Sequence, residues 1–142
     1  MISSAKKYGF RGYIASRPLM GDRIPQHVQN MVIRDYADRN SLNYLLSATE
    51  YAMPNCFMML EKVIRELSSL EGVICYSLFM LPLNADMRRS IYNSFILADT
   101  ELHFALEHLK ASSQKQIQDI ETIWRLQRSL DYCPKEISDG FD

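Results

Sequence analysis

The sequence predicts a single α/β domain, built on a parallel sheet of about four strands with helices on both faces. Short runs rich in β-branched and aromatic residues alternate regularly with segments of helical periodicity. The run GVICYSL, residues 72–78, is apolar throughout, which is typical of a strand buried on both faces of a parallel sheet. The length of 142 residues fits one domain.

The first strand is expected over residues 10–15, followed by a loop that contains two prolines and a glycine. Pro25 suits the first turn of the next helix, where a missing N–H costs nothing. Asn40 is the expected stop of that helix. Its apolar positions recur at helical spacing and are Val28, Met31, Val32 and Tyr36.

The second strand is expected over residues 42–48, and the turn TEYAMPN leads to a helix from about Asn55. The apolar stripe of this helix consists of Phe57, Leu60, Val63, Ile64 and Leu67. The third strand is the run 72–78. Pro82 and Asn84 mark the loop and cap before a third helix, which runs through Met87, Ile91 and Phe95.

The fourth strand is expected over residues 101–106, and the last helix over roughly 112–130. Ile117, Ile120 and Trp124 share one side of that helix, so it either packs on the sheet or pairs two subunits as a homodimer. The single domain therefore spans residues 1–130. Residues 131–142 contain proline, glycine and four acidic residues and are expected to form a loosely held tail.

Composition excludes several classes of function. The formal net charge is −1, with 16 basic and 17 acidic residues, so neither a nucleic acid nor an anionic membrane is an expected partner. Three cysteines without a CxxC pair suit a reducing cytoplasm, where we expect the protein to reside. Three histidines without ligand spacing predict no metal site. No Walker or GxGxxG motif is present, and the sequence identifies no cofactor.

The carboxyl ends of parallel strands lie at one edge of the sheet, where ligands bind in open α/β folds. Four loops are expected there: 16–24, 49–55, 77–83 and 105–110. In the first, Arg17 and Arg23 flank Gly21 ahead of a helix N-terminus, an arrangement that suits a phosphate or a carboxylate. The alternative is that both arginines are solvated, or pair with Asp22 and Glu50.

Proton-transfer candidates lie on the first helix and the fourth strand. His27 and Asn30 are three residues apart and share a helix face. Glu101 and His103 alternate with apolar residues and point to one face of their strand. Histidine titrates close to neutral pH and can act as acid or base. The structural alternatives are a capping or surface role for His27 and a satisfied core group for His103.

Ser16, at the end of the first strand, is a candidate nucleophile if His27 or His103 serves as its base and Glu50 orients that base. Serine at a strand end is also a common turn or cap residue. The remaining candidates for contact with a substrate lie at other strand ends: Tyr51, Tyr76, Ser77 and Glu107. Tyr51 could stack on a sugar ring or hydrogen-bond its hydroxyls.

Four blocks covering most of the chain resemble the sporadic carbohydrate cluster protein family: GYIASRPLMGDRIPQHVQNMVIRDY, LLSATEYAMPNCFMMLE, GVICYSLFMLP and ELHFALE. That bacterial family is defined by its place among genes for surface-sugar biosynthesis. The resemblance implies a pathway, lipopolysaccharide O-antigen or capsule synthesis, and it implies no particular reaction.

A second, remote resemblance concerns the fold. A strand that ends in serine, the helix after it and a third strand with an L-x-x-L-like exit are similar to the catalytic domain of serine recombinases. The expected fold is therefore flavodoxin- or resolvase-like, with Ser16 near the position of that family's nucleophile. The recombinase arginines are absent, because Ile14 and Ala15 precede the serine and LFMLP follows the third strand. DNA strand exchange is therefore not expected.

Together these observations predict a cytoplasmic protein that binds a phosphorylated or nucleotide-activated sugar, with rearrangement of that sugar by acid–base chemistry as its reaction if it is an enzyme. Arg17 and Arg23 would hold the anion, and His27 and His103 would move protons. One alternative is a non-catalytic partner or scaffold of a neighbouring sugar enzyme. Another is a serine hydrolase or transferase that uses Ser16 on a recombinase-like fold.

Overall fold

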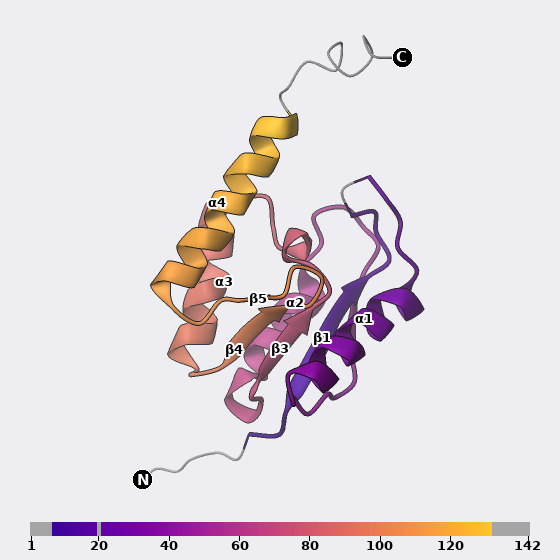
Figure 1. Ribbon diagram of the computed structural model, residues 1–142, viewed down its shortest axis with the longest axis vertical. Coiled ribbons are helices and arrows are strands. Elements are labelled where there is room, and N and C mark those ends of the chain that lie inside the picture. The colour runs from indigo at the N-terminus through magenta and orange to yellow at the C-terminus, as the bar shows by residue number, and fades with distance from the viewer. Residues whose placement is uncertain (1–6, 20, 132–142) are drawn as a thin grey trace.

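The computed structural model describes residues 7–19 and 21–131 and has one five-stranded sheet in the order β2-β1-β3-β4-β5 (Figure 1). The strands are β1 (Phe10–Ala15), β2 (Ala48–Glu50), β3 (Gly72–Cys75), β4 (Glu101–Phe104) and β5 (Leu109–Lys110). The first four are parallel, and β5 pairs antiparallel with β4. A small α/β domain with a mostly parallel sheet is thus confirmed, with five strands instead of four.

The fifth strand comes from a hairpin that the sequence prediction missed. The expected strand 101–106 ends at Phe104, and the chain turns so that Leu109 pairs with Phe104. His108 adopts a left-handed conformation in this turn, with φ of 56°. Hairpin turns of that kind are usually marked by glycine or asparagine. Because neither occurs between residues 104 and 109, the sequence gives no signal for the reversal.

The second strand is shorter and later than expected, since β2 covers Ala48–Glu50 and not 42–48. The segment before it contacts α1 (Gln26–Arg39) through side chains. The Tyr44 hydroxyl and the Ser47 hydroxyl both donate to Asn30 Oδ1 of α1, at 3.3 and 2.7 Å. Tyr44 also forms an isolated bridge with Phe10 of β1, and the regular ladder begins only at Ala48.

The other helices are α2 (Met58–Arg65), α3 (Ala85–Leu97) and α4 (Gln114–Asp131), with 3₁₀ turns at Leu67–Ser69 and Leu78–Met80. Asn84 caps α3 as expected, because its Oδ1 accepts the Met87 N–H at 3.0 Å. The second helix begins three residues later than predicted. Asn55 has φ of 58°, a left-handed conformation that a helix cannot include.

The register of the strands sorts their side chains onto two faces of the sheet. Phe10 and His103 lie on the face that α1 covers, where the His103 ring contacts Tyr36 of α1. Arg11 and Tyr13 lie on the opposite face, toward α2, whose flanking Glu66 pairs with Arg11 at 2.9 Å. Helix α3 packs with α2 and β4. The expected placement of helices on both faces is confirmed.

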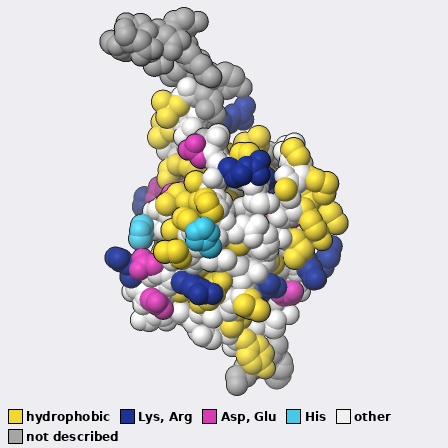
Figure 2. Space-filling view, turned by 90° about the vertical axis from the view of Figure 1, so that its right-hand side faces the viewer, with side chains coloured by type: hydrophobic (Ala, Val, Ile, Leu, Met, Phe, Trp, Pro, Cys, Tyr) yellow, Lys and Arg dark blue, Asp and Glu magenta, His cyan; other side chains and the backbone are white. Residues whose placement is uncertain are grey.

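Helix α4 runs alongside α3 and continues past the end of the sheet (Figure 1). Ile117, Ile120 and Trp124 are buried against the core, which confirms the apolar side predicted for this helix. On the face shown in Figure 2, basic and acidic side chains are interspersed with apolar ones. Cys56 and Cys75 are buried and free.

No helix in the described ranges is both long enough and apolar enough to span a bilayer. Of the predicted tail 131–142, residues 132–142 lie outside the described part of the chain. Asp131 is the last residue of α4.

Candidate functional site

A pocket of about 320 Å³ lies at the carboxyl edge of the sheet, between the loop after β1, the loop after β2, the 3₁₀ turn after β3, and α4. Its apolar lining includes Phe57, Phe79 and Trp124. Among the residues that the structure describes, its charged lining consists of Arg17 and Arg128, and no Asp or Glu lines it. We call it the Arg17 pocket. The sequence placed three further loops at this edge beside residues 16–24. Two of them, 49–55 and 77–83, contribute to the wall of the pocket.

Arg17 is held across the pocket by backbone carbonyls. Its guanidinium donates to Cys56 O at 2.7 Å and to Met80 O at 3.4 Å, and it lies over the Phe57 ring at 4.7 Å. No carboxylate in the described chain forms an ion pair with it. The result is an oriented, half-buried cation with N–H groups to spare, because a guanidinium has five and two are used here.

Arg23 and Ser16 lie in the same loop but do not line the pocket. Arg23 donates to the Ser16 carbonyl at 3.2 Å and is exposed, so its guanidinium closes the loop on itself. The Ser16 side chain is half-buried. Pairing with Asp22 or Glu50 was the alternative expected for the arginines. Among the described contacts Arg23 forms neither pair.

Gln29 is a residue that the sequence reading missed. It is buried on α1, its Oε1 accepts the Ala15 N–H at 3.1 Å, and its Nε2 donates to Ala15 O at 2.6 Å and to Ile24 O at 2.9 Å. The amide thus pairs with the end of β1 as a further strand would and fixes the direction of the loop that carries Arg17. Gln29 precedes Ile33 and Tyr36 at helical spacing, and a polar residue on that apolar face was the available signal.

Glu50, at the end of β2, is 1% exposed and accepts hydrogen bonds on both oxygens. The donors are the Tyr13 hydroxyl at 2.7 Å and the backbone N–H groups of Tyr51, Met59 and Leu60 at 3.0–3.1 Å. Burial alone would raise the pKa of Glu50, but these donors, with the Tyr13 hydroxyl first, lower it below its ordinary value. The carboxylate therefore caps α2 beneath the pocket, and Tyr51 beside it is half exposed.

Ser77 and Glu107 come together at the 3₁₀ turn after β3. The buried Ser77 hydroxyl donates to Glu107 Oε2 at 2.6 Å and accepts the Phe79 N–H at 3.1 Å, while Glu107 Oε1 accepts the Leu78 N–H at 2.9 Å. This pair fixes the turn that supplies Phe79 and Met80 to the pocket. Tyr76 is buried next to it, and burial followed by the Glu107 charge raises the pKa of its hydroxyl.

The histidines predicted for proton transfer do not line the Arg17 pocket. His27 is exposed near the start of α1, and Asn30 is engaged with Tyr44 and Ser47. His103 is buried beneath a separate cavity on the α1 face of the sheet, where it contacts Tyr36 and Glu101. Glu101 and His103 share one face of β4 as predicted, and in addition their side chains pair at 2.8 Å. The arginines predicted to bind an anion and the histidines predicted to transfer protons thus lie at different places in this fold.

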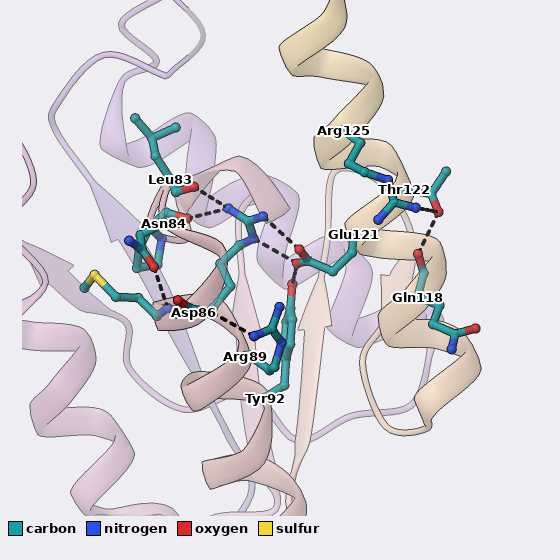
Figure 3. A network of polar contacts seen from close by, with 12 residues as sticks. Leu83, Asn84, Asp86, Arg89, Tyr92, Gln118, Glu121, Thr122 and Arg125 are labelled. Carbon is teal, nitrogen blue, oxygen red and sulfur yellow. Dashed lines mark hydrogen bonds and ion pairs between the residues drawn. The ribbon is translucent and has the colours of Figure 1, made fainter.

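The α4 wall of the Arg17 pocket is fixed by an ion pair between the buried Arg88 of α3 and the half-buried Glu121 of α4. Arg88 donates from Nε and Nη2 to the two carboxylate oxygens of Glu121 at 2.8 Å, and the Tyr92 hydroxyl donates to Glu121 at 2.6 Å (Figure 3). The Arg88 guanidinium also lies over the Trp124 ring at 4.3 Å. Trp124 Nε1 has no hydrogen-bond partner among the described residues. Trp124 Nε1 is thus a buried donor on this wall that a ligand could satisfy.

No metal-binding group of three or more His, Cys, Asp or Glu side chains exists in the described chain. The arrangement has instead the chemistry of an anion site, with an unneutralised arginine, a second arginine on α4 and aromatic walls.

Comparison with known proteins identifies the fold. No family model matches this chain, and no curated protein matches it. The solved N-terminal catalytic domain of TP901-1 integrase is similar in structure, with a TM-score of 0.60 and 16% sequence identity over 86% of this chain and 99% of that domain. This likeness concerns the fold alone and supports the second, fold-level resemblance. The resemblance to the carbohydrate cluster family finds no support in these comparisons and stays a prediction.

Proposed function

We propose that this protein binds a phosphorylated or nucleotide-activated sugar in the Arg17 pocket, as a component of bacterial surface-carbohydrate biosynthesis. The pathway rests on the four sequence blocks that resemble the carbohydrate cluster family. The ligand class rests on the pocket itself, whose charged lining within residues 7–19 and 21–131 consists of arginines.

The observation that carries the proposal is the state of Arg17. A half-buried guanidinium normally has a carboxylate partner, because desolvating an unpaired charge is costly. Arg17 has two carbonyls and an aromatic ring instead. A phosphate would supply the missing negative charge and accept the remaining N–H groups in a bidentate fashion. Arg128, on the α4 wall, is placed to contact the same ligand.

The aromatic and apolar part of the pocket gives the ligand a second requirement. Phe57, Phe79 and Trp124 offer flat surfaces beside the arginines, and the Phe79 and Trp124 rings meet edge to face at 5.1 Å. A sugar ring or a nucleoside has the apolar faces that such walls accommodate, whereas inorganic phosphate does not. We therefore expect an organic phosphate to bind more tightly than phosphate alone.

The test is calorimetric titration, preceded by a thermal-shift screen of sugar phosphates and nucleotide sugars. Arg17→Gln is expected to weaken binding by roughly 10- to 100-fold, because a hydrogen bond to a charged group contributes about 1.5–3 kcal/mol. Arg128→Ala is expected to weaken it as well. Arg125→Ala is the matched control, since Arg125 is an exposed arginine on the same helix that does not line the pocket.

Equal affinities for the wild type and Arg17→Gln would remove the Arg17 pocket from the proposal. Absence of binding by every organic phosphate in the screen would favour the alternative of a scaffold for a neighbouring sugar enzyme.

The likeness to a recombinase catalytic domain favours one further candidate, a hydrolase or transferase with Ser16 as nucleophile. Ser16 follows β1 directly and is half-buried at the edge where the pocket opens. Labelling of the wild type by a fluorophosphonate, lost in Ser16→Ala, is the expected result for this candidate. If the folded wild-type protein is not labelled by the fluorophosphonate, this candidate is contradicted.

A further inference from the structure

A second cavity, of about 270 Å³, lies on the α1 face of the sheet between α1, β5 and α4. Tyr36 and Asn40 of α1, His103 of β4 and Gln116 of α4 line it. The remaining charged or titratable groups around it are His108 and Lys110 near β5 and Asp119 of α4. Glu101 is not part of the lining; its half-exposed side chain bonds to His103 and pairs with Lys110 at 3.9 Å. Nothing in the Arg17 pocket depends on this cavity, so the two are separate candidates for ligands.

Three of these residues form a hydrogen-bonded chain. The Tyr36 hydroxyl lies 2.6 Å from His103 Nδ1, and His103 Nε2 lies 2.8 Å from Glu101 Oε1. An ionised carboxylate only accepts hydrogen bonds, so we assign the imidazole proton to Nε2. Nδ1 is then an acceptor, and the Tyr36 hydroxyl donates to it. This order of hydroxyl, imidazole and carboxylate is the arrangement that activates a hydroxyl in general-base catalysis.

The surroundings keep the His103 imidazole neutral and able to accept a proton. Burial lowers the pKa of His103, although the Glu101 carboxylate pulls in the opposite direction, and the nearby Lys110 charge lowers it further. Burial and the Glu101 charge raise the pKa of Tyr36, so its hydroxyl stays protonated. Tyr36 can therefore pass a proton inward to His103 while it receives another from the cavity.

We propose that this cavity is a proton-abstraction site for an uncharged hydroxy carbonyl compound. A carbon-bound proton next to the carbonyl moves to Tyr36 Oη as the Tyr36 proton moves to His103 Nδ1. The electron pair of the broken C–H bond stays on the ligand as an enediolate, and the imidazolium formed is stabilised by Glu101. Lys110, which lies 3.9 Å from Glu101 Oε2, adds positive charge beside the enediolate oxygen, and the amides of Asn40 and Gln116 suit neighbouring hydroxyls. Return of a proton to carbon restores every group.

In these roles Tyr36 is the catalytic residue, because of the three hydrogen-bonded residues it is the one that contacts the reacting proton. His103 and Glu101 act through it as positioning residues. The site requires nothing of Arg17, so its failure and the failure of the proposed anion binding are read by different measurements.

The experiment incubates the full chain with dihydroxyacetone in D₂O and follows loss of the carbon-bound proton signal by NMR. The wild type is expected to exchange protons faster than buffer alone. Tyr36→Phe, which retains the ring, is expected to slow that exchange about 100-fold or more, as general acid–base groups contribute roughly 10²–10⁴-fold. Tyr44→Phe is the matched control, because Tyr44 also bonds to α1 and lies outside this cavity.

Titration of His103 by NMR gives a second readout. Loss of the Tyr36 donor removes a hydrogen bond to the neutral imidazole, so the pKa of His103 should rise in Tyr36→Phe. Glu101→Gln should lower it, and the pH profile of exchange should move with the titration in both variants. The proposal is overturned if the wild type exchanges no faster than buffer. It is overturned equally if Tyr36→Phe exchanges as fast as the wild type, or if Tyr44→Phe slows exchange as much as Tyr36→Phe does.

Discussion

Arg88→Ala is expected to lower the free energy of unfolding by up to about 3–5 kcal/mol, the effect of removing one partner from a buried ion pair, because Arg88 is buried and the Glu121 side chain is only 22% exposed. Arg88 is 3% exposed and contacts two elements at once. It pairs with both oxygens of Glu121 and donates to the Pro82 and Leu83 carbonyls at 3.0 and 2.7 Å. The substitution leaves these acceptors without their donor and removes the cation from the Trp124 ring.

The measurement is urea unfolding followed by the fluorescence of Trp124, the one tryptophan in the chain. Arg89→Ala is the matched control. Arg89 is the next residue of the same helix, and it also pairs with a carboxylate, that of Asp86, but it is exposed. Such surface pairs contribute about 0–1 kcal/mol. A loss in Arg88→Ala no larger than in Arg89→Ala would show that the ion pair does not hold α4 in place.

Replacing both partners distinguishes a lost attraction from a stranded charge. In Arg88→Met with Glu121→Leu no buried charge is left, and buried ion pairs replaced in this way often recover stability. We therefore expect the double variant to be more stable than either single variant. Its Tyr92 hydroxyl loses its acceptor, so recovery should be incomplete.

Glu50→Gln is expected to cost about 2–4 kcal/mol, although the two side chains have nearly the same shape. Both carboxylate oxygens accept N–H groups, from Leu60 on one and from Tyr51 and Met59 on the other. The amide of glutamine places its own N–H₂ against one of these sets, which leaves buried donors facing each other. Each unsatisfied buried group costs about 1–3 kcal/mol, and more where a charge is involved.

The pH dependence of this variant follows from the lowered pKa of Glu50. A carboxyl group whose pKa is lower in the folded than in the unfolded chain contributes its full stability above the unfolded value, about 4.3. That contribution is lost as the pH falls through the folded value. The difference in unfolding free energy between wild type and Glu50→Gln should therefore be constant near neutral pH and shrink below about pH 4.5. Urea unfolding at a series of pH values measures it.

A difference that stays constant down to the most acidic pH at which the protein folds would contradict the assigned role of Glu50. Tyr51→Phe is a suitable control for local disturbance, since the Tyr51 side chain is half exposed and its backbone N–H is the group that bonds Glu50.

The class of fold followed from local patterns in the sequence. The alternation of strand and helix, the apolar run at β3 and the proline and asparagine caps of α1 and α3 each depend on residues close in the chain. The hairpin to β5 and the true start of β2 did not, because His108 carries the turn in an unusual conformation and residues 42–47 pack on α1. Neither the hairpin nor the start of β2 can be predicted from the local propensities of these residues.

The location of Arg17 at the carboxyl edge was likewise available from the sequence, since parallel strands end at one edge. The composition of the pocket was not. Trp124 and Arg128 come from α4, more than 100 residues after Arg17, and only the packing of α4 on α3 brings them to that wall.

Roles of the polar residues were decided by tertiary structure alone. The sequence determined that carboxylates, tyrosines and histidines lie near strand ends, because side-chain alternation and strand direction are local properties. Whether Glu50 meets a ligand or the N-terminus of α2, and whether His103 faces Arg17 or Tyr36, depends on which helix covers which face of the sheet. That choice is made by burial of apolar surface over the whole domain, which no short stretch of sequence specifies.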